Sequence, residues 1–174
     1  MGFQSVWIWR AGGIILFSIN LGTLDLDESL FSGFWTAISA FSKEVSNSPL
    51  DFVRMGPLSI FSSTTNEITF AVAVDREVKE REAWFKLGEI IKAFFEMYTD
   101  KISDPFAPRE TFDDFNPILT AIIFKEFKEK GISGERLKEA FSYLELRDEL
   151  EDALEVIEGA LEGTGNKIEQ NDSD

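Results

Sequence analysis

The chain has 174 residues, and its 17 Lys and Arg against 32 Asp and Glu give a formal net charge of −15 at pH 7. It contains no cysteine and no histidine, which excludes disulfides, thiolate metal sites, Cys-His and Ser-His-Asp catalysis and the usual zinc sites. The negative charge argues against binding to nucleic acid or to anionic membranes, because both attract basic surfaces. A protein or a small molecule is the expected partner, and we expect neither a metal nor a cofactor.

Two strands are predicted at the start of the chain, at residues 6–10 and 14–19. β-Branched and aromatic residues fill both segments, and Gly12 and Gly13 between them supply the positive φ values of a tight turn. The two segments therefore predict an antiparallel hairpin. This turn accounts for the glycine pair, which joins two strands and so does not have the setting of a phosphate-binding loop.

The first strand has two different faces, because alternate side chains point to opposite sides of a sheet. Trp7 and Trp9 share one face, and aliphatic residues share the other with Arg10. Both faces can be buried if helices cover one and a partner or the C-terminal extension covers the other. Arg10 and the glycine pair also interrupt the apolar run at residues 7–21, which is too short for the roughly 20 residues of a membrane span. We expect a cytoplasmic protein without direct membrane insertion.

A helix is predicted from Asp25, because Asp25 and Glu28 have the spacing of a capping box. Large apolar residues then recur every three or four positions and predict one apolar face, which comprises Leu30, Phe31, Phe34, Ile38, Phe41 and Val45. Trp35 flanks this face. The proline at position 49 ends the helix.

The period changes to two between residues 51 and 75, which predicts three strands at 52–55, 58–61 and 68–74 with a polar turn at 62–67. The last strand is almost wholly apolar, so we place it centrally in the sheet. Helical spacing returns at residues 83–98 and again at 115–127, separated by prolines. The order β-β-α-β-β-β-α-α predicts an α+β fold in which helices pack on one five-stranded antiparallel sheet.

This order resembles that of the longin-domain family, whose fold is profilin-like. The resemblance covers residues 1–130 and is carried by the 6–17 hairpin, the 29–34 helix start and the 68–75 strand, which are most similar to archaeal members. Some longin domains begin SNAREs and others form the small subunits of clathrin adaptors. The related roadblock fold begins with a helix, whereas this chain is predicted to begin with a strand.

The composition changes after residue 130. Ser133 is a suitable cap for a helix that carries Leu137, Phe141 and Leu144, and a second apolar register follows that includes Leu154 and Ile157. We divide the chain into a longin-like domain at 1–130, an acidic helical extension at 131–162 and a disordered tail at 163–174. The acidic face of the extension is explained by solvation, and docking onto a basic surface is the alternative. The extension is predicted to fold back on the domain or on a second copy of it.

Carboxylates are the nearest approach to a catalytic set. They cluster at Asp25, Asp27 and Glu28, at Asp100 and Asp104, and at Asp113 and Asp114. Each cluster lies at a helix start or in a proline-containing loop, where aspartate satisfies free N–H groups. We interpret them as capping residues, and we predict no catalytic residues and no metal ligands.

The longin resemblance implies a non-enzymatic scaffold that binds a small GTPase or another longin or roadblock domain, as in trafficking-type GTPase regulation, and it allows a homodimer. Binding would use the first helix and an exposed sheet edge, either 14–20 or 52–55. The predicted partner-binding residues are Leu30, Phe31, Phe34, Trp35, Ile38, Ile14 and Leu16, with Phe31 and Trp35 as the leading anchors. Two alternatives remain open: a small-molecule sensor with polar groups converging in a pocket, and an enzyme that uses paired carboxylates.

Overall fold

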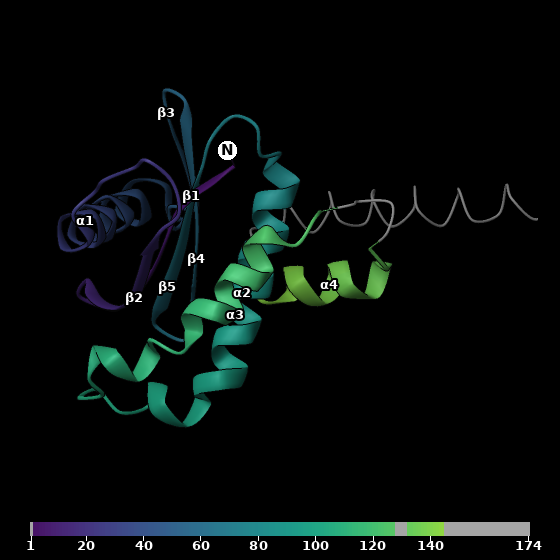
Figure 1. Cartoon of the computed structure of the whole chain (residues 1–174). Coiled ribbons are helices and arrows are strands. Elements are labelled where there is room, and N and C mark those ends of the chain that lie inside the picture. Colours follow the sequence, from purple (N-terminus) through teal and green to yellow (C-terminus); the bar gives the residue numbers. More distant parts are fainter. Residues whose placement is uncertain (1, 128–131, 145–174) are drawn as a thin grey trace, which may run out of the picture.

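The computed structural model describes residues 2–127 and 132–144. The five strands form one antiparallel sheet in the order β2-β1-β5-β4-β3. One helix, α1, lies on one side of the sheet, and α2, α3 and α4 lie on the other side (Figure 1). The elements are β1 (Phe3–Arg10), β2 (Ile14–Asn20), α1 (Glu28–Ser46), β3 (Phe52–Met55), β4 (Leu58–Thr65), β5 (Ile68–Val74), α2 (Glu80–Ile102), the 3-10 helix η1 (Arg109–Phe112), α3 (Phe115–Phe124) and α4 (Gly134–Ser142). The α+β fold class, the element order and the central position of the 68–74 strand are confirmed.

The two faces of β1 are buried in different cores, as the alternation of its side chains predicts. Trp7 and Trp9 lie in a small cluster beneath α1. Val6 and Ile8 lie in the main core, which α2, α3 and α4 cover on the opposite face. Helices therefore bury both faces of the central strands.

Two boundaries differ from the sequence prediction. The N-cap of α1 is Asp27, whose carboxylate accepts a hydrogen bond from the N–H of Leu30 at 2.8 Å, so the prediction that the helix begins at Asp25 is wrong by two residues. The turn predicted at 62–67 is reduced to Asn66 and Glu67, because the threonines before it continue the pairing of β4 with β5. Both turn residues have positive φ, of 50° and 64°.

The edge strands of the sheet are β2 and β3, as predicted. The η1 segment lies close to the β2 edge through Arg109, whose guanidinium donates to Ser18 Oγ on β2 and to both carboxylate oxygens of Glu28 on α1. This single arginine thus connects the loop, the edge strand and the start of α1.

The second layer is held together by the long helix α2. The buried Lys86 of α2 donates from Nζ to the backbone carbonyls of Ile122 and Lys125 at 2.5 Å each, which satisfies the end of α3. Burial lowers the pKa of this lysine, and nearby Glu89 opposes the shift. The side chain is therefore part of the packing between α2 and α3.

The start of the extension folds back on α2, as predicted. Ser133 accepts from the N–H of Arg136 and caps α4, and Leu137, Phe141 and Leu144 are buried in the main core. Gly88 of α2 permits this docking, because a Cβ at that position would lie 2.1 Å from the carbonyl oxygen of Ala140. The second register of the extension, with Leu154 and Ile157, and the 163–174 tail lie outside the described residues, and the division of the chain into three parts stays a prediction. No helix in the described ranges is both long and apolar enough to cross a bilayer.

Candidate interaction surface on the first helix

The inner side of α1 is formed by Phe31, Ser32 and Trp35. Phe31 stacks on Trp7 with ring centroids 4.0 Å apart, and it also contacts the edge of Trp9. The indole Nε1 of Trp35 donates to Ser62 Oγ at 3.1 Å, and that hydroxyl donates onward to the carbonyl of Leu50. Phe31 and Trp35 are therefore components of the small core.

The expectation that Phe31 and Trp35 are exposed anchors is wrong, since they are only 6% and 1% exposed. The physical reason lies in the sheet beneath them. Two alanines of β5, Ala71 and Ala73, belong to the same cluster and leave room for large side chains, and Ser62 provides the acceptor that a buried indole N–H requires. Truncating either aromatic residue would therefore disrupt packing.

The two partner-binding residues predicted on β2 differ in their exposure to solvent. Leu16 is buried in the main core, so its assignment to an exposed edge surface is wrong. Ile14, at the start of the strand, is 61% exposed. The difference follows from position along the strand, since Ile14 lies at the end of β2 opposite Arg10, beyond the part of the strand that the core covers.

The outer flank of α1 carries an apolar stripe, which we define as Leu30, Phe34, Ile38, Phe41 and Val45. Four of these side chains are exposed, at 72% for Leu30, 51% for Phe34, 64% for Phe41 and 69% for Val45, and Ile38 is half-buried. Their spacing of four, four, three and four residues keeps them on one flank over about 22 Å of helix. Soluble proteins rarely expose so continuous an apolar surface without using it for contacts.

Charge is sparse on this helix. In a chain of net charge −15, α1 carries only Glu28, Lys43 and Glu44. Glu28 is already engaged by Arg109, and the hydrogen bond from that guanidinium lowers the pKa of the carboxyl while burial opposes the shift. The stripe can therefore approach another apolar surface without bringing many charges out of water.

Side-chain hydrogen bonds to backbone N–H groups support the capping interpretation for Asp27 and Asp104, whereas Asp114 makes no such bond at the start of α3. Asp27 caps α1, and Asp104 accepts from the N–H of Phe106 within its own loop. Asp113 and Asp114 flank the junction between η1 and α3. In the part of the chain that the structure describes, no three acidic residues come together in a group that could hold a metal ion.

The sequence prediction did not include Phe41 and Val45 in the binding surface, although it placed them on the apolar face. The apolar face alone does not show which side of the helix contacts the sheet. The serines at positions 32, 39 and 42 were the sequence signal for that side, because they follow the inner side of the helix and suit close packing on a crowded sheet. A helix with serines on one side and large apolar residues on the next can bury its serine side.

Comparisons with known proteins establish the fold. No protein-family model matches the chain, and no curated protein matches it. A chain in a homology model of the full-length AP-3 complex in a stretched open conformation aligns with a TM-score of 0.52 and 12% identity over 95% of this chain and 98% of its own length. A Roadblock/LC7 domain from Streptomyces avermitilis gives a TM-score of 0.48 and 14% identity over 57% of this chain and 87% of its own. The fold is longin-like, and the resemblance inferred from element order is confirmed at that level.

Proposed function

We propose that the protein is a non-enzymatic interaction module that binds a protein partner through the apolar stripe of α1. The observation that carries this proposal is the stripe itself, because four large side chains are exposed along one flank of a single helix. Apolar side chains clustered on a surface are typical of contact sites, and a few of them usually supply most of the binding energy. Phe34 and Phe41 are the leading anchors in place of the two buried aromatic residues.

The partner that this surface fits best is another longin or roadblock domain, including a second copy of the chain. A straight helical flank with apolar residues every three or four positions packs well against a second helix of the same kind. The few charges on α1 allow even two acidic copies to meet there. A small GTPase in trafficking-type regulation, which the longin resemblance also implies for a cytoplasmic protein, is the second partner to test.

The test compares two double variants of the full chain. Phe34→Ala with Phe41→Ala removes the two aromatic anchors while keeping good helix formers in α1. Phe106→Ala with Phe124→Ala is the matched control, because these phenylalanines are 90% and 71% exposed on other elements. Self-association is measured by analytical ultracentrifugation, and binding to purified longin and roadblock domains and small GTPases is measured by calorimetry.

We expect the α1 variant to weaken association by about 2 kcal/mol or more, as for hot-spot residues, and to unfold at the same temperature as the unmodified protein. The control variant should bind normally. Equal binding by both variants, or an equal loss in both, would remove α1 as the binding surface.

A further inference from the structure

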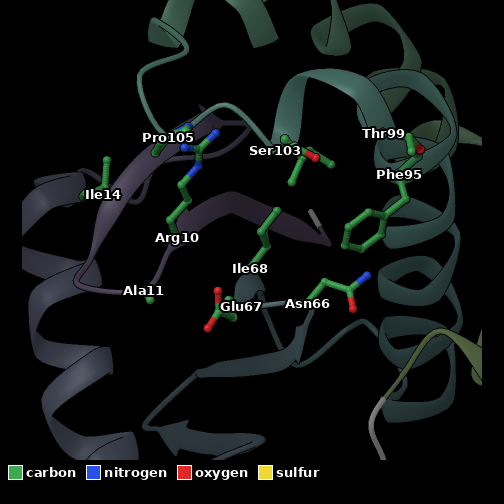
Figure 2. A pocket seen from close by; sticks show the side chains of 11 residues that line it. Arg10, Ala11, Ile14, Asn66, Glu67, Ile68, Phe95, Thr99, Ser103 and Pro105 are labelled. Atoms are coloured by element: carbon green, nitrogen blue, oxygen red, sulfur yellow. The ribbon is translucent and has the colours of Figure 1, made fainter.

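A pocket of about 640 Å³ lies at one end of the sheet, on the face opposite to α1. Three separate parts of the chain form it: the β1–β2 hairpin, the turn between β4 and β5, and the C-terminal end of α2 with the loop that follows (Figure 2). Its volume is within the range of small-molecule sites. It is separate from the proposed partner surface, which lies across the sheet.

Arg10 is the group in this pocket that needs an explanation. It ends β1 on the aliphatic face, opposite Ile14 on one side and Ile68 on the other. Its Nε and Nη2 are shut off from solvent, and neither has a hydrogen-bond partner among the described residues. Arg10 as a whole is half-buried, so these two nitrogens are shielded and not the entire guanidinium, yet most shielded polar atoms in native proteins are paired.

The surroundings of Arg10 do not compensate its charge. Glu67 lines the same pocket but is exposed, and Figure 2 shows its carboxylate directed away from the guanidinium. The end of α2 offers only the partial negative charge of its free carbonyls. The guanidinium can therefore still bind an acidic group.

Other side chains in the pocket could bind the rest of a ligand. The amide of Asn66 and the hydroxyl of Ser103 make no hydrogen bond in the described residues, whereas the hydroxyl of Thr99 already donates within its helix. Ile68 and the ring of Phe95 provide an apolar wall, as Figure 2 shows. A cationic group, free polar groups and an apolar wall are the components of a site for a small organic acid.

We propose that this pocket binds a small monocarboxylate, whose acidic group pairs with Arg10 and whose apolar or aromatic body packs on Ile68 and Phe95. A planar carboxylate matches the fork of a guanidinium. A single negative charge fits better than a multiply charged phosphate ester, because Glu67 and the C-terminal end of α2 are also nearby. Asn66 and Ser103 would donate to the free oxygens of the ligand.

The test is an NMR titration of the isotope-labelled full chain with phenylacetate, using neutral phenylacetamide as the control ligand. We expect saturable shifts at the backbone amides of Asn66, Ile68 and Ser103 and at the Nε–H of Arg10, with phenylacetate only. Arg10→Gln should weaken binding about tenfold or more, as for loss of a charge-assisted hydrogen bond. Arg54→Gln, at an exposed arginine on β3 outside the pocket, should leave binding unchanged.

Ser103→Ala and Asn66→Gly keep the test decisive if Arg10→Gln does not fold, since each removes one polar group without burying another. Each should weaken phenylacetate binding severalfold. The absence of shifts at these positions, equal binding of the acid and the amide, or full binding by all three variants would overturn the proposal.

The acidic chain after Leu144 is the other possible occupant. The carbonyl of Tyr143 accepts from Thr65 Oγ1 at 3.1 Å, so the described chain ends beside the turn that lines the pocket, and Glu145, Asp148 and Glu149 follow in the sequence. We therefore also measure the full-chain variant with these three residues changed to Gln, Asn and Gln, without added ligand. An Arg10 Nε–H signal that stays in place supports the small-molecule site, and one that moves identifies the chain itself as the occupant and overturns it.

Discussion

A single arginine connects three parts of the chain at the residue scale. Arg109 donates to Ser18 and to Glu28, so the loop before α3, the edge strand β2 and the first turn of α1 share one set of hydrogen bonds. The hydrogen bond from Arg109 is the main reason that the pKa of Glu28 lies below 4.5, and burial of the carboxyl opposes the shift. The ionised carboxylate is therefore favoured in the folded protein.

This network predicts a measurable pH dependence. Because the folded pKa of Glu28 is lower than the unfolded value, its stabilisation is fully present above about pH 4.5 and is lost as the pH falls through the folded pKa. Glu28→Gln should lower the free energy of unfolding at pH 7 by about 0.5–1 kcal/mol, a partly exposed pair being worth no more. It should also flatten the acid limb of the stability curve.

Urea unfolding of Glu28→Gln at several pH values between 3 and 7 checks this expectation. Glu44→Gln on the exposed side of the same helix is the matched control, because that carboxylate forms no ion pair with any other residue that the structure describes. Identical pH profiles for the two variants would show that Arg109 does not act through Glu28.

At the scale of elements, the docking of α4 on α2 depends on a missing side chain. A Cβ on Gly88 would lie 2.1 Å from the carbonyl oxygen of Ala140, and backbone cannot move aside as a flexible side chain can. We expect Gly88→Ala to destabilise the protein by about 1–3 kcal/mol, as other overpacked sites do, although alanine is the better helix former. The amide signals of α4 should shift.

Gly33 in α1 is the matched control for this substitution, because a Cβ there would meet nothing within 4 Å. Gly33→Ala should stabilise the protein by up to about 1 kcal/mol through helix propensity alone. Denaturant unfolding of both variants measures the two effects, and equal stabilisation would show that α4 does not pack closely at Gly88. The open space also shows that Gly33 is not required for close packing of α1.

The elements also show what the sequence can and cannot predict. Periodicity located the strands and helices well, because the two faces of β1 and the central position of β5 follow directly from alternation. The orientation of α1 did not follow from it. The helix has large apolar residues on two adjacent sides, and only the sheet beneath decides that Phe31 and Trp35 face inward.

The candidate sites illustrate the same limit. The exposure of Leu30 and Phe34 agrees with the surface predicted on the first helix, whereas the burial of Leu16 does not. The Arg10 pocket could not be predicted, because it combines residues near positions 10, 66 and 103 that only the folded chain brings together. A lone arginine among aliphatic residues was its one sequence signal.

On the scale of the whole molecule, the sheet separates two hydrophobic cores of unequal size. The main core combines residues from α2, α3, α4 and the sheet, whereas the small cluster beneath α1 depends chiefly on Phe31 and Trp35 from that helix. The second half of α1 is mostly exposed. Regions with few buried contacts open at lower free energy than the rest of a protein, so we expect α1 to separate from the sheet before α2 unfolds.

The unequal distribution of tryptophans between the two cores makes intrinsic fluorescence a probe of the small core. Three of the four tryptophans, Trp7, Trp9 and Trp35, are in the small cluster, and only Trp84 lies in the main core. In a Trp84→Phe variant, every indole that emits light would therefore report on the layer beneath α1, while far-ultraviolet circular dichroism would follow mainly the longer helices. We expect the red shift of emission to occur at a lower urea concentration than the loss of helix signal, and coincident transitions would show that the two layers unfold together. The same emission would then detect a partner bound to α1 without any attached dye.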